Sequence, residues 1–224
     1  MILDEKINEF LTEKGLNIYN FYGSKPGKYV FNPYYYYDSE RAIYIEIYDF
    51  DKTFNMMEIE KRIKYMEEKM NTLLKEKQYV DIFSLMEKGL RLNYLNIWYF
   101  DIPEDQRLEV FDLAYSSSEY NFNIDEDILD DIKKLAKSRL QNFDDEVIIY
   151  RGETEKSTHY IEAYSWTLDL ATAKFFATRF NSKGKIYTAK IKKKDIINYI
   201  TDRNEEEILL NSDDLINVKL YKEF

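Results

Sequence analysis

The sequence contains no cysteine, a single histidine, three prolines and six glycines among its 224 residues. The lack of cysteine excludes disulfides, thiolate nucleophiles and cysteine-ligated zinc or iron–sulfur centres. The one histidine, His159, leaves histidine-rich metal sites and Ser-His-Asp catalysis without enough parts. We therefore expect no metal cofactor, and any catalysis has to use other side chains.

Long apolar segments are also missing from the chain. No run approaches the ~18 apolar residues of a membrane-spanning helix, and the first ten residues carry acids where a signal peptide has basic residues. We expect a cytoplasmic protein without a membrane partner. Leaderless secretion, or delivery into a target cell, would leave the same sequence and stays open.

Basic residues are outnumbered, with 32 Lys and Arg against 42 Asp and Glu and a net charge of −10. A molecule of this charge is repelled by polyanions, so nucleic-acid binding would need a local basic patch. Residues 174–194 contain eight basic residues and no acid. This segment is either a nucleic-acid surface or an ordinary solvated face, and we favour the second.

Aromatic side chains, in contrast, are abundant. They make up 17% of the residues, including 21 tyrosines, within a globular composition of 45% hydrophobic and 33% charged residues. Four tyrosines in a row stand at residues 34–37. We interpret this run first as a consequence of composition and second as a binding platform.

Hydrophobic periodicity predicts an α+β protein. Up to about residue 142 the patterns are mainly helical, over 1–15, 53–77, 80–90, from Pro103 and from Asp125, with a strand at 41–49 and a strand or helix edge at 95–100. From residue 143 onward strands prevail, at 147–150, 165–168, 184–191, 208–210 and 218–221, with a helix at 170–180. We therefore divide the chain into a helical region, 1–142, and a strand-rich core, 143–224, which could form one continuous domain.

The strand-rich core begins with an arginine that follows an apolar run. Arg151 comes after Val-Ile-Ile-Tyr and is followed by Gly152, so we expect it at the end of a buried strand, where glycine permits a sharp turn or close approach of a ligand. A guanidinium fixed there can hold a phosphate or a carboxylate through two parallel hydrogen bonds. The plainer alternative is an arginine paired with a nearby acid.

A hydroxyl-bearing segment and a helix follow. Ser165, Trp166 and Thr167 begin a short strand, and Asp169 can cap the next helix. That helix carries small alanines, which permit close packing, together with the adjacent Phe175 and Phe176. One phenylalanine could stack on an aromatic ligand, or both could belong to the core.

Three consecutive glutamates precede the apolar residues 208–210. If 205–209 is extended, Glu205 and Glu207 point to one side, about 7 Å apart, and Glu206 points to the other. Two carboxylates would then face one cleft. The alternative is an acidic turn exposed to solvent.

In this order, the Tyr-Arg-Gly, Ser-Trp-Thr and Glu-Glu-Glu segments resemble the Arg, Ser-x-Ser/Thr and Glu-x-Glu motifs of mono-ADP-ribosyltransferases of the Arg-Ser-Glu class. The resemblance covers residues 147 to about 221. It implies an ADP-ribosyltransferase-like split β-sandwich in the C-terminal part, NAD as co-substrate and no metal. The helical N-terminal region would pack on this core.

The resemblance also implies a role for each matching residue. Arg151 would bind the NAD phosphates and the nicotinamide ribose, Ser165 would brace the catalytic glutamate and the ribose, and Thr167 would stabilise the strand. Phe175 or Phe176 would pack near nicotinamide. The remaining members of the expected NAD site are Gly152 and Trp166.

The Glu-x-Glu motif would supply the catalytic acids. Glu207 would grip the ribose 2′-hydroxyl, and Glu205 would orient or deprotonate the acceptor. A carboxylate near the ribose would stabilise the positive charge that develops as the bond to nicotinamide breaks. Glutamate in the first position is similar to arginine-modifying members of the family.

The expected function is therefore NAD-dependent transfer of ADP-ribose to a macromolecule, as in a toxin or effector, with protein favoured over nucleic acid as acceptor. An antitoxin or inhibitor is a further conceivable partner. An NAD glycohydrolase and a non-catalytic interaction protein remain as alternatives. The chain departs from the family pattern in the short interval from Arg151 to Ser165, in the large Trp166 within the Ser-x-Thr motif, and in the position of His159, which we assign to a loop.

Overall fold

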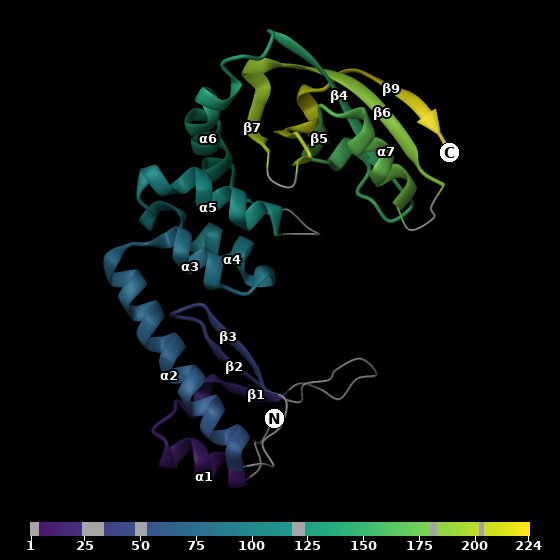
Figure 1. The fold of residues 1–224 in the computed structure, drawn as a ribbon. Coiled ribbons are helices and arrows are strands. Elements are labelled where there is room, and N and C mark those ends of the chain that lie inside the picture. The colour runs from purple at the N-terminus through teal and green to yellow at the C-terminus, as the bar shows by residue number, and fades with distance from the viewer. Residues whose placement is uncertain (1–4, 24–33, 48–52, 118–123, 180–182, 202–203) are drawn as a thin grey trace. The chain divides into compact units, whose positions relative to one another are not determined.

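The described chain falls into two units, Met1–Asn121 and Phe122–Phe224, in a computed structural model. The structure describes residues 5–23, 34–47, 53–117, 124–179, 183–201 and 204–224. Within them lie a small N-terminal sheet, a helical middle region and a six-stranded antiparallel sheet (Figure 1). The expected α+β class is confirmed at this level.

The first unit is mainly helical, as predicted. Its helices are α1 Glu5–Glu13, α2 Thr53–Glu76, α3 Tyr79–Leu85, α4 Lys88–Trp98 and α5 Glu104–Ser116. Chain reversal after α1 uses Gly15, whose φ of 64° lies in the left-handed region that glycine tolerates.

One detail of the helical prediction was wrong, and an alternative left open is decided. The helix expected over 80–90 is divided between α3 and α4, because the side chain of Glu87 caps α4 by accepting a hydrogen bond from the N–H of Gly89 at 2.6 Å. Gly89 therefore lies in the first turn of a helix and does not end one. For the segment 95–100, a strand and a helix edge were the two alternatives, and the helix edge is confirmed, since the segment forms the end of α4 and most of the 3₁₀ turn η2, Tyr99–Asp101.

The small sheet of the first unit contains β1 Phe21–Gly23, β2 Tyr34–Asp38 and β3 Ile43–Ile47, in the order β1-β2-β3. The predicted alternation is confirmed in β3, where all three isoleucines are buried. The tyrosine run forms β2, which the sequence analysis did not predict. Gly23, Pro26 and Gly27 predict a loop over 23–27, and most of this segment lies outside the described residues.

The second unit is built around the larger sheet. Its strands are β4 Glu146–Glu153, β5 Ser165–Thr167, β6 Lys185–Lys192, β7 Ile196–Ile200, β8 Glu207–Leu210 and β9 Ile216–Glu223, in the order β7-β8-β5-β4-β6-β9. Helix α7, Leu170–Thr178, lies against β4 (Figure 1). The strands and helix predicted beyond residue 143 are all found, with boundaries shifted by a few residues.

This second unit begins earlier than the sequence-based division at 142/143. Helix α6, Glu126–Leu135, and the 3₁₀ turn η3, Ala136–Leu140, both contact β7. In η3, Arg139 donates from one terminal nitrogen to the Asn198 side-chain oxygen at 3.1 Å and to the Tyr199 carbonyl at 3.2 Å. These contacts attach a helical segment to the sheet, and β7 itself was not predicted.

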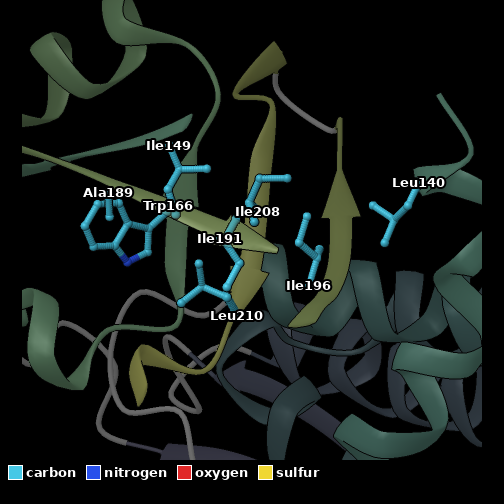
Figure 2. Close-up of a cluster of buried hydrophobic side chains, with 8 residues drawn as sticks. All are labelled: Leu140, Ile149, Trp166, Ala189, Ile191, Ile196, Ile208 and Leu210. Atoms are coloured by element: carbon cyan, nitrogen blue, oxygen red, sulfur yellow. The ribbon is translucent and has the colours of Figure 1, made fainter. Parts of the chain in front are cut away.

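A hydrophobic cluster from several strands fills one side of the sheet (Figure 2). The cluster contains Leu140, Ile149, Trp166, Ala189, Ile191, Ile196, Ile208 and Leu210. Trp166 is its largest member and is 1% exposed. Burying such side chains contributes roughly 1.5–3 kcal/mol each, so this cluster fixes the strands that carry the candidate site.

Candidate functional site

The candidate site is centred on β5, which lies between β4 and β8. Thr167 is aligned with Tyr150 of β4 on one side and with Glu207 of β8 on the other. Three segments that are far apart in the sequence therefore meet at β5. Long-range strand pairing, and not local sequence, creates this proximity.

Ser165 and Glu207 are in direct contact. The Ser165 hydroxyl donates a hydrogen bond to Oε1 of Glu207 across 42 residues of sequence. Glu207 is only 7% exposed, and burying a carboxylate is costly unless donors satisfy it. The hydroxyl therefore fixes the position of this carboxylate.

Arg151 connects three segments of the chain. Its Nε lies 3.0 Å from Oε1 of Glu153, one terminal nitrogen donates to the Ser165 carbonyl at 2.6 Å, and the other donates to the Thr158 carbonyl at 2.7 Å. We expected Arg151 at the end of its strand, and this was wrong, because β4 continues to Glu153. The guanidinium thus holds both β5 and the segment before it.

The strand register places the side chains of Arg151 and Glu207 on opposite faces of the sheet. Aligned residues of neighbouring strands share a face, so Tyr150, Thr167 and Glu207 lie together, whereas Arg151 follows Tyr150 and points to the other side. Ser165 joins the two sides, because its hydroxyl meets Glu207 and its carbonyl meets Arg151.

Glu153 is a buried acid that the sequence analysis did not single out. It is 7% exposed, and burial raises the pKa of its carboxyl, an effect that Arg151, His159 and the Tyr160 N–H partly oppose. The Arg-x-Glu spacing within one strand was the signal that could have identified it, since residues two apart share a face. Arg151 is therefore paired with a nearby acid, Glu153, as the plainer alternative for this arginine predicted.

Gly152 allows α7 to lie directly on β4. A Cβ on Gly152 would lie 1.9 Å from the Ala173 carbonyl oxygen and 2.7 Å from the Ala177 nitrogen, both backbone atoms of α7. Ala173 and Ala177 are fully buried in this contact. Helix packing therefore accounts for Gly152.

Helix α7 begins as predicted. Both oxygens of Asp169 accept backbone hydrogen bonds, from Ala171 at 3.0 Å and from Thr172 at 2.8 Å, and Oδ2 also accepts from the Thr172 hydroxyl at 2.8 Å. The Thr172 hydroxyl, together with the two backbone N–H groups, lowers the pKa of the carboxyl. The cap therefore connects the first turn of α7 to the end of β5.

The two phenylalanines of α7 do not belong to the core. Phe175 is 63% exposed and Phe176 is half-buried, with ring centroids 5.4 Å apart in an edge-to-face arrangement. The Arg179 guanidinium lies 5.0 Å from the centre of the Phe176 ring. The interpretation of both rings as core residues is therefore wrong.

The glutamates before β8 form a turn. Glu206 has a φ of 46°, and β8 begins only at Glu207, so the extended conformation assumed for 205–209 is wrong. The Thr167 hydroxyl donates to the Glu205 carbonyl at 2.6 Å, and the Leu168 N–H donates to the Glu206 carbonyl at 3.1 Å. These bonds fix the turn against β5, so the strand alternation does not determine where Glu205 points.

The side chain of Trp166 belongs to the core shown in Figure 2. By the same alternation it points away from the face that carries the Ser165 and Glu207 side chains. Its Nε1 has no hydrogen-bond partner among the described residues. The large residue within the Ser-x-Thr motif therefore fills the interior.

The basic segment 174–194 is partly neutralised. Lys185 lies 3.4 Å from Glu223 and Lys190 lies 2.6 Å from Glu146. Lys193 donates to the backbone carbonyls of residues 141 and 143. These contacts agree with the interpretation as a solvated face.

No group of three or more acidic, histidine or cysteine side chains suited to hold a metal occurs in the described part of the chain. None of the helices described there has the length and apolar character that a membrane span requires. Comparisons with protein-family models, with curated proteins and with solved structures found no match.

Proposed function

We propose that the second unit is an NAD-dependent mono-ADP-ribosyltransferase of the Arg-Ser-Glu type, with a split β-sandwich related to that family. The contact that carries this proposal is the hydrogen bond from Ser165 to Glu207. It joins the two motif residues that the reaction requires in proximity. The acceptor would be a macromolecule, with an arginine side chain of a protein favoured.

The chemistry suits a carboxylate held in this way. Cleavage of the bond between nicotinamide and ribose develops positive charge on the sugar, and a fixed carboxylate stabilises that charge. Nicotinamide departs from a cationic ring, so the leaving group needs no general acid. Glu207, 7% exposed and hydrogen-bonded by Ser165, would act in this role.

The contacts of Arg151 modify the role that the resemblance implies. Three of its nitrogens already donate to Glu153, Ser165 and Thr158. Under this proposal, Arg151 positions Ser165, and the positive charge of its guanidinium attracts an NAD phosphate.

Glu205 would act on the acceptor. Its backbone carbonyl is tied to Thr167 at the start of the turn that precedes β8. The side chain is half-buried. Removal of this carboxylate should therefore impair transfer to an acceptor more than hydrolysis of NAD by water.

Labelled NAD incubated with the full chain and a cell lysate tests the proposal. Transfer predicts label on macromolecules, which Glu205→Ala should reduce more than it reduces release of free ADP-ribose. Free ADP-ribose without labelled macromolecules would identify an NAD glycohydrolase instead. Absence of any turnover, with intact folding by circular dichroism, would refute the enzymatic proposal.

A non-catalytic interaction protein is the second candidate, and one observation favours it. The side chains of Arg151 and Glu207 lie on opposite faces of the sheet, and Arg151 is occupied by internal contacts. In that case the constellation would only stabilise the fold. The same NAD assay separates this candidate from the enzyme.

A further inference from the structure

The sheet of the first unit has one buried face and one face of tyrosines. On the buried face, the β1, β2 and β3 residues Phe21, Tyr36 and Ile45 align across the strands. The Tyr36 hydroxyl donates to Glu67 of α2 at 2.6 Å, and α2 contacts β3. Helix α2 therefore covers this face, and the alternate residues of each strand point to the other side.

The second face carries four tyrosines, which we call the tyrosine face: Tyr22, Tyr35, Tyr37 and Tyr44. Their positions follow from the register, in which Tyr22 is aligned with Tyr35, and Tyr37 with Tyr44. The rings of Tyr22 and Tyr35 are stacked, 5.2 Å apart at 15°, and Tyr35 lies 5.5 Å from Tyr44. Together these rings form a continuous aromatic surface.

Tyr37 connects one end of the tyrosine face to α4, and the other three rings keep part of their surface exposed. The Tyr37 hydroxyl lies 2.9 Å from the hydroxyl of Tyr94, a buried residue of α4. Tyr22 is 41% exposed, and Tyr35 and Tyr44 are half-buried. A ligand would therefore contact the rings of Tyr22, Tyr35 and Tyr44.

Two carboxylates give this face a negative character. Glu46 is aligned with Tyr35 and lies two residues from Tyr44, so it shares their face, and it is exposed. Burial raises the pKa of Tyr44, and the charges of Glu46 and Glu87 raise it further. The negative charges of both acids therefore act on the Tyr44 hydroxyl.

We propose that the tyrosine face binds an arginine-bearing extended segment of a partner protein. Aromatic rings attract cations placed over their faces, and the guanidinium stacks on a flat ring better than the compact lysine ammonium does. Glu46 supplies the opposite charge beside the rings. This surface is independent of the NAD chemistry proposed for the second unit.

Nucleic acid is the alternative ligand for stacked aromatic rings, since bases also stack on tyrosine. Such sites combine the rings with a positively charged groove that holds the phosphates. Here the rings are accompanied by Glu46 and Glu87, and the whole chain carries a net charge of −10. The charges thus favour a cationic partner.

Fluorescence anisotropy with the full chain tests this inference. The probes are a labelled peptide in which arginine alternates with glycine and serine, the matching lysine peptide, and a single-stranded oligothymidine. At physiological ionic strength we expect the arginine peptide to bind more tightly than the lysine peptide, and the oligothymidine not to bind. Preferential binding of oligothymidine would overturn the proposal in favour of a nucleic-acid surface.

Matched variants separate a specific surface from general attraction to an acidic protein. Tyr35→Val keeps a residue suited to a strand and should weaken arginine-peptide binding about tenfold. Glu46→Gln, at an exposed position, should weaken it without changing the fold. Tyr65→Leu is the control, because Tyr65 is 59% exposed on α2, outside the tyrosine face. Tyr65→Leu should bind the peptide as the wild type does, and equal affinity in the wild type and in Tyr35→Val would overturn the proposal.

Discussion

Ser165 donates its hydroxyl to the buried carboxylate of Glu207, and this bond spans strands β5 and β8. The carbonyl of the same serine accepts a hydrogen bond from Arg151 at 2.6 Å. One residue therefore links two parts of the sheet through different atoms. Its side chain and its backbone can be tested separately, because substitution removes only the first contact.

Ser165→Ala should lower kcat/KM for NAD turnover by about ten- to a hundredfold. The variant leaves the Glu207 carboxylate without its hydroxyl donor, a loss of about 1–3 kcal/mol. Ser165→Thr retains a hydroxyl and suits a strand, so it should recover part of the activity. Steady-state kinetics with NAD measure the effect, and an alanine variant as active as the wild type would contradict the bracing role.

Gly152→Ala should destabilise the second unit by roughly 1–3 kcal/mol or more, because the added methyl would overlap backbone atoms of α7. Hydrogen exchange of the α7 amides measures this locally. Gly89→Ala is the matched control: its Cβ would meet the flexible Glu87 side chain at 3.0 Å. Unchanged protection of α7 in Gly152→Ala would show that the close packing on β4 is not required.

Glu153 should make stability depend on pH. Burial raises the pKa of its carboxyl above the ordinary value, so the folded state holds the proton more tightly than the unfolded state does. The protonated Glu153 carboxyl contributes its full stabilisation below the pKa that it has in the unfolded state. This stabilisation is lost as pH rises through the pKa that it has in the folded state. The wild type should therefore lose stability relative to Glu153→Gln over this interval.

Denaturant unfolding between about pH 4 and pH 8 measures this difference. Glu155→Gln serves as the control, since Glu155 is exposed in the same segment. A wild type that gains stability relative to Glu153→Gln as pH rises would show that the ion pair with Arg151 outweighs burial.

Phe175→Ala should separate packing from ligand binding. The ring is 63% exposed, so its removal should change the free energy of unfolding by no more than about 0.5 kcal/mol. If the ring packs near nicotinamide, KM for NAD should rise while stability stays unchanged. Ala173→Leu, at a fully buried position of the same helix, should instead lower stability. Unchanged KM in Phe175→Ala would remove this ring from the proposed NAD site.

Local sequence patterns predicted much of the second unit. Alternation and apolar runs located β4, β6, β8 and β9, and the cap at Asp169 located the start of α7. Strand β7 was missed because Asn198 interrupts its apolar residues and a lysine-rich segment precedes it. It therefore shows neither an uninterrupted apolar run nor a period-two alternation.

The candidate site was predictable in its residue types but not in its geometry. The sequence identified Ser165 and Glu207, and their contact arises from the pairing of β5 with β8. The left-handed conformation of Glu206 could not be anticipated, because it depends on hydrogen bonds from the end of β5. Likewise, the side chain of Arg151 lies on the face opposite to that of Glu207 because of how β4 pairs with β5. The sequence of β4 alone does not reveal this pairing.

The most direct test of the central claim is NAD turnover by the wild type and by Glu207→Gln, measured as nicotinamide release. Glutamine preserves the size of the side chain and an oxygen that can accept the Ser165 hydroxyl, but it removes the negative charge. Our account predicts turnover by the wild type and a loss of at least about a hundredfold in the variant. Equal turnover by the two proteins, or none by the folded wild type, would contradict it.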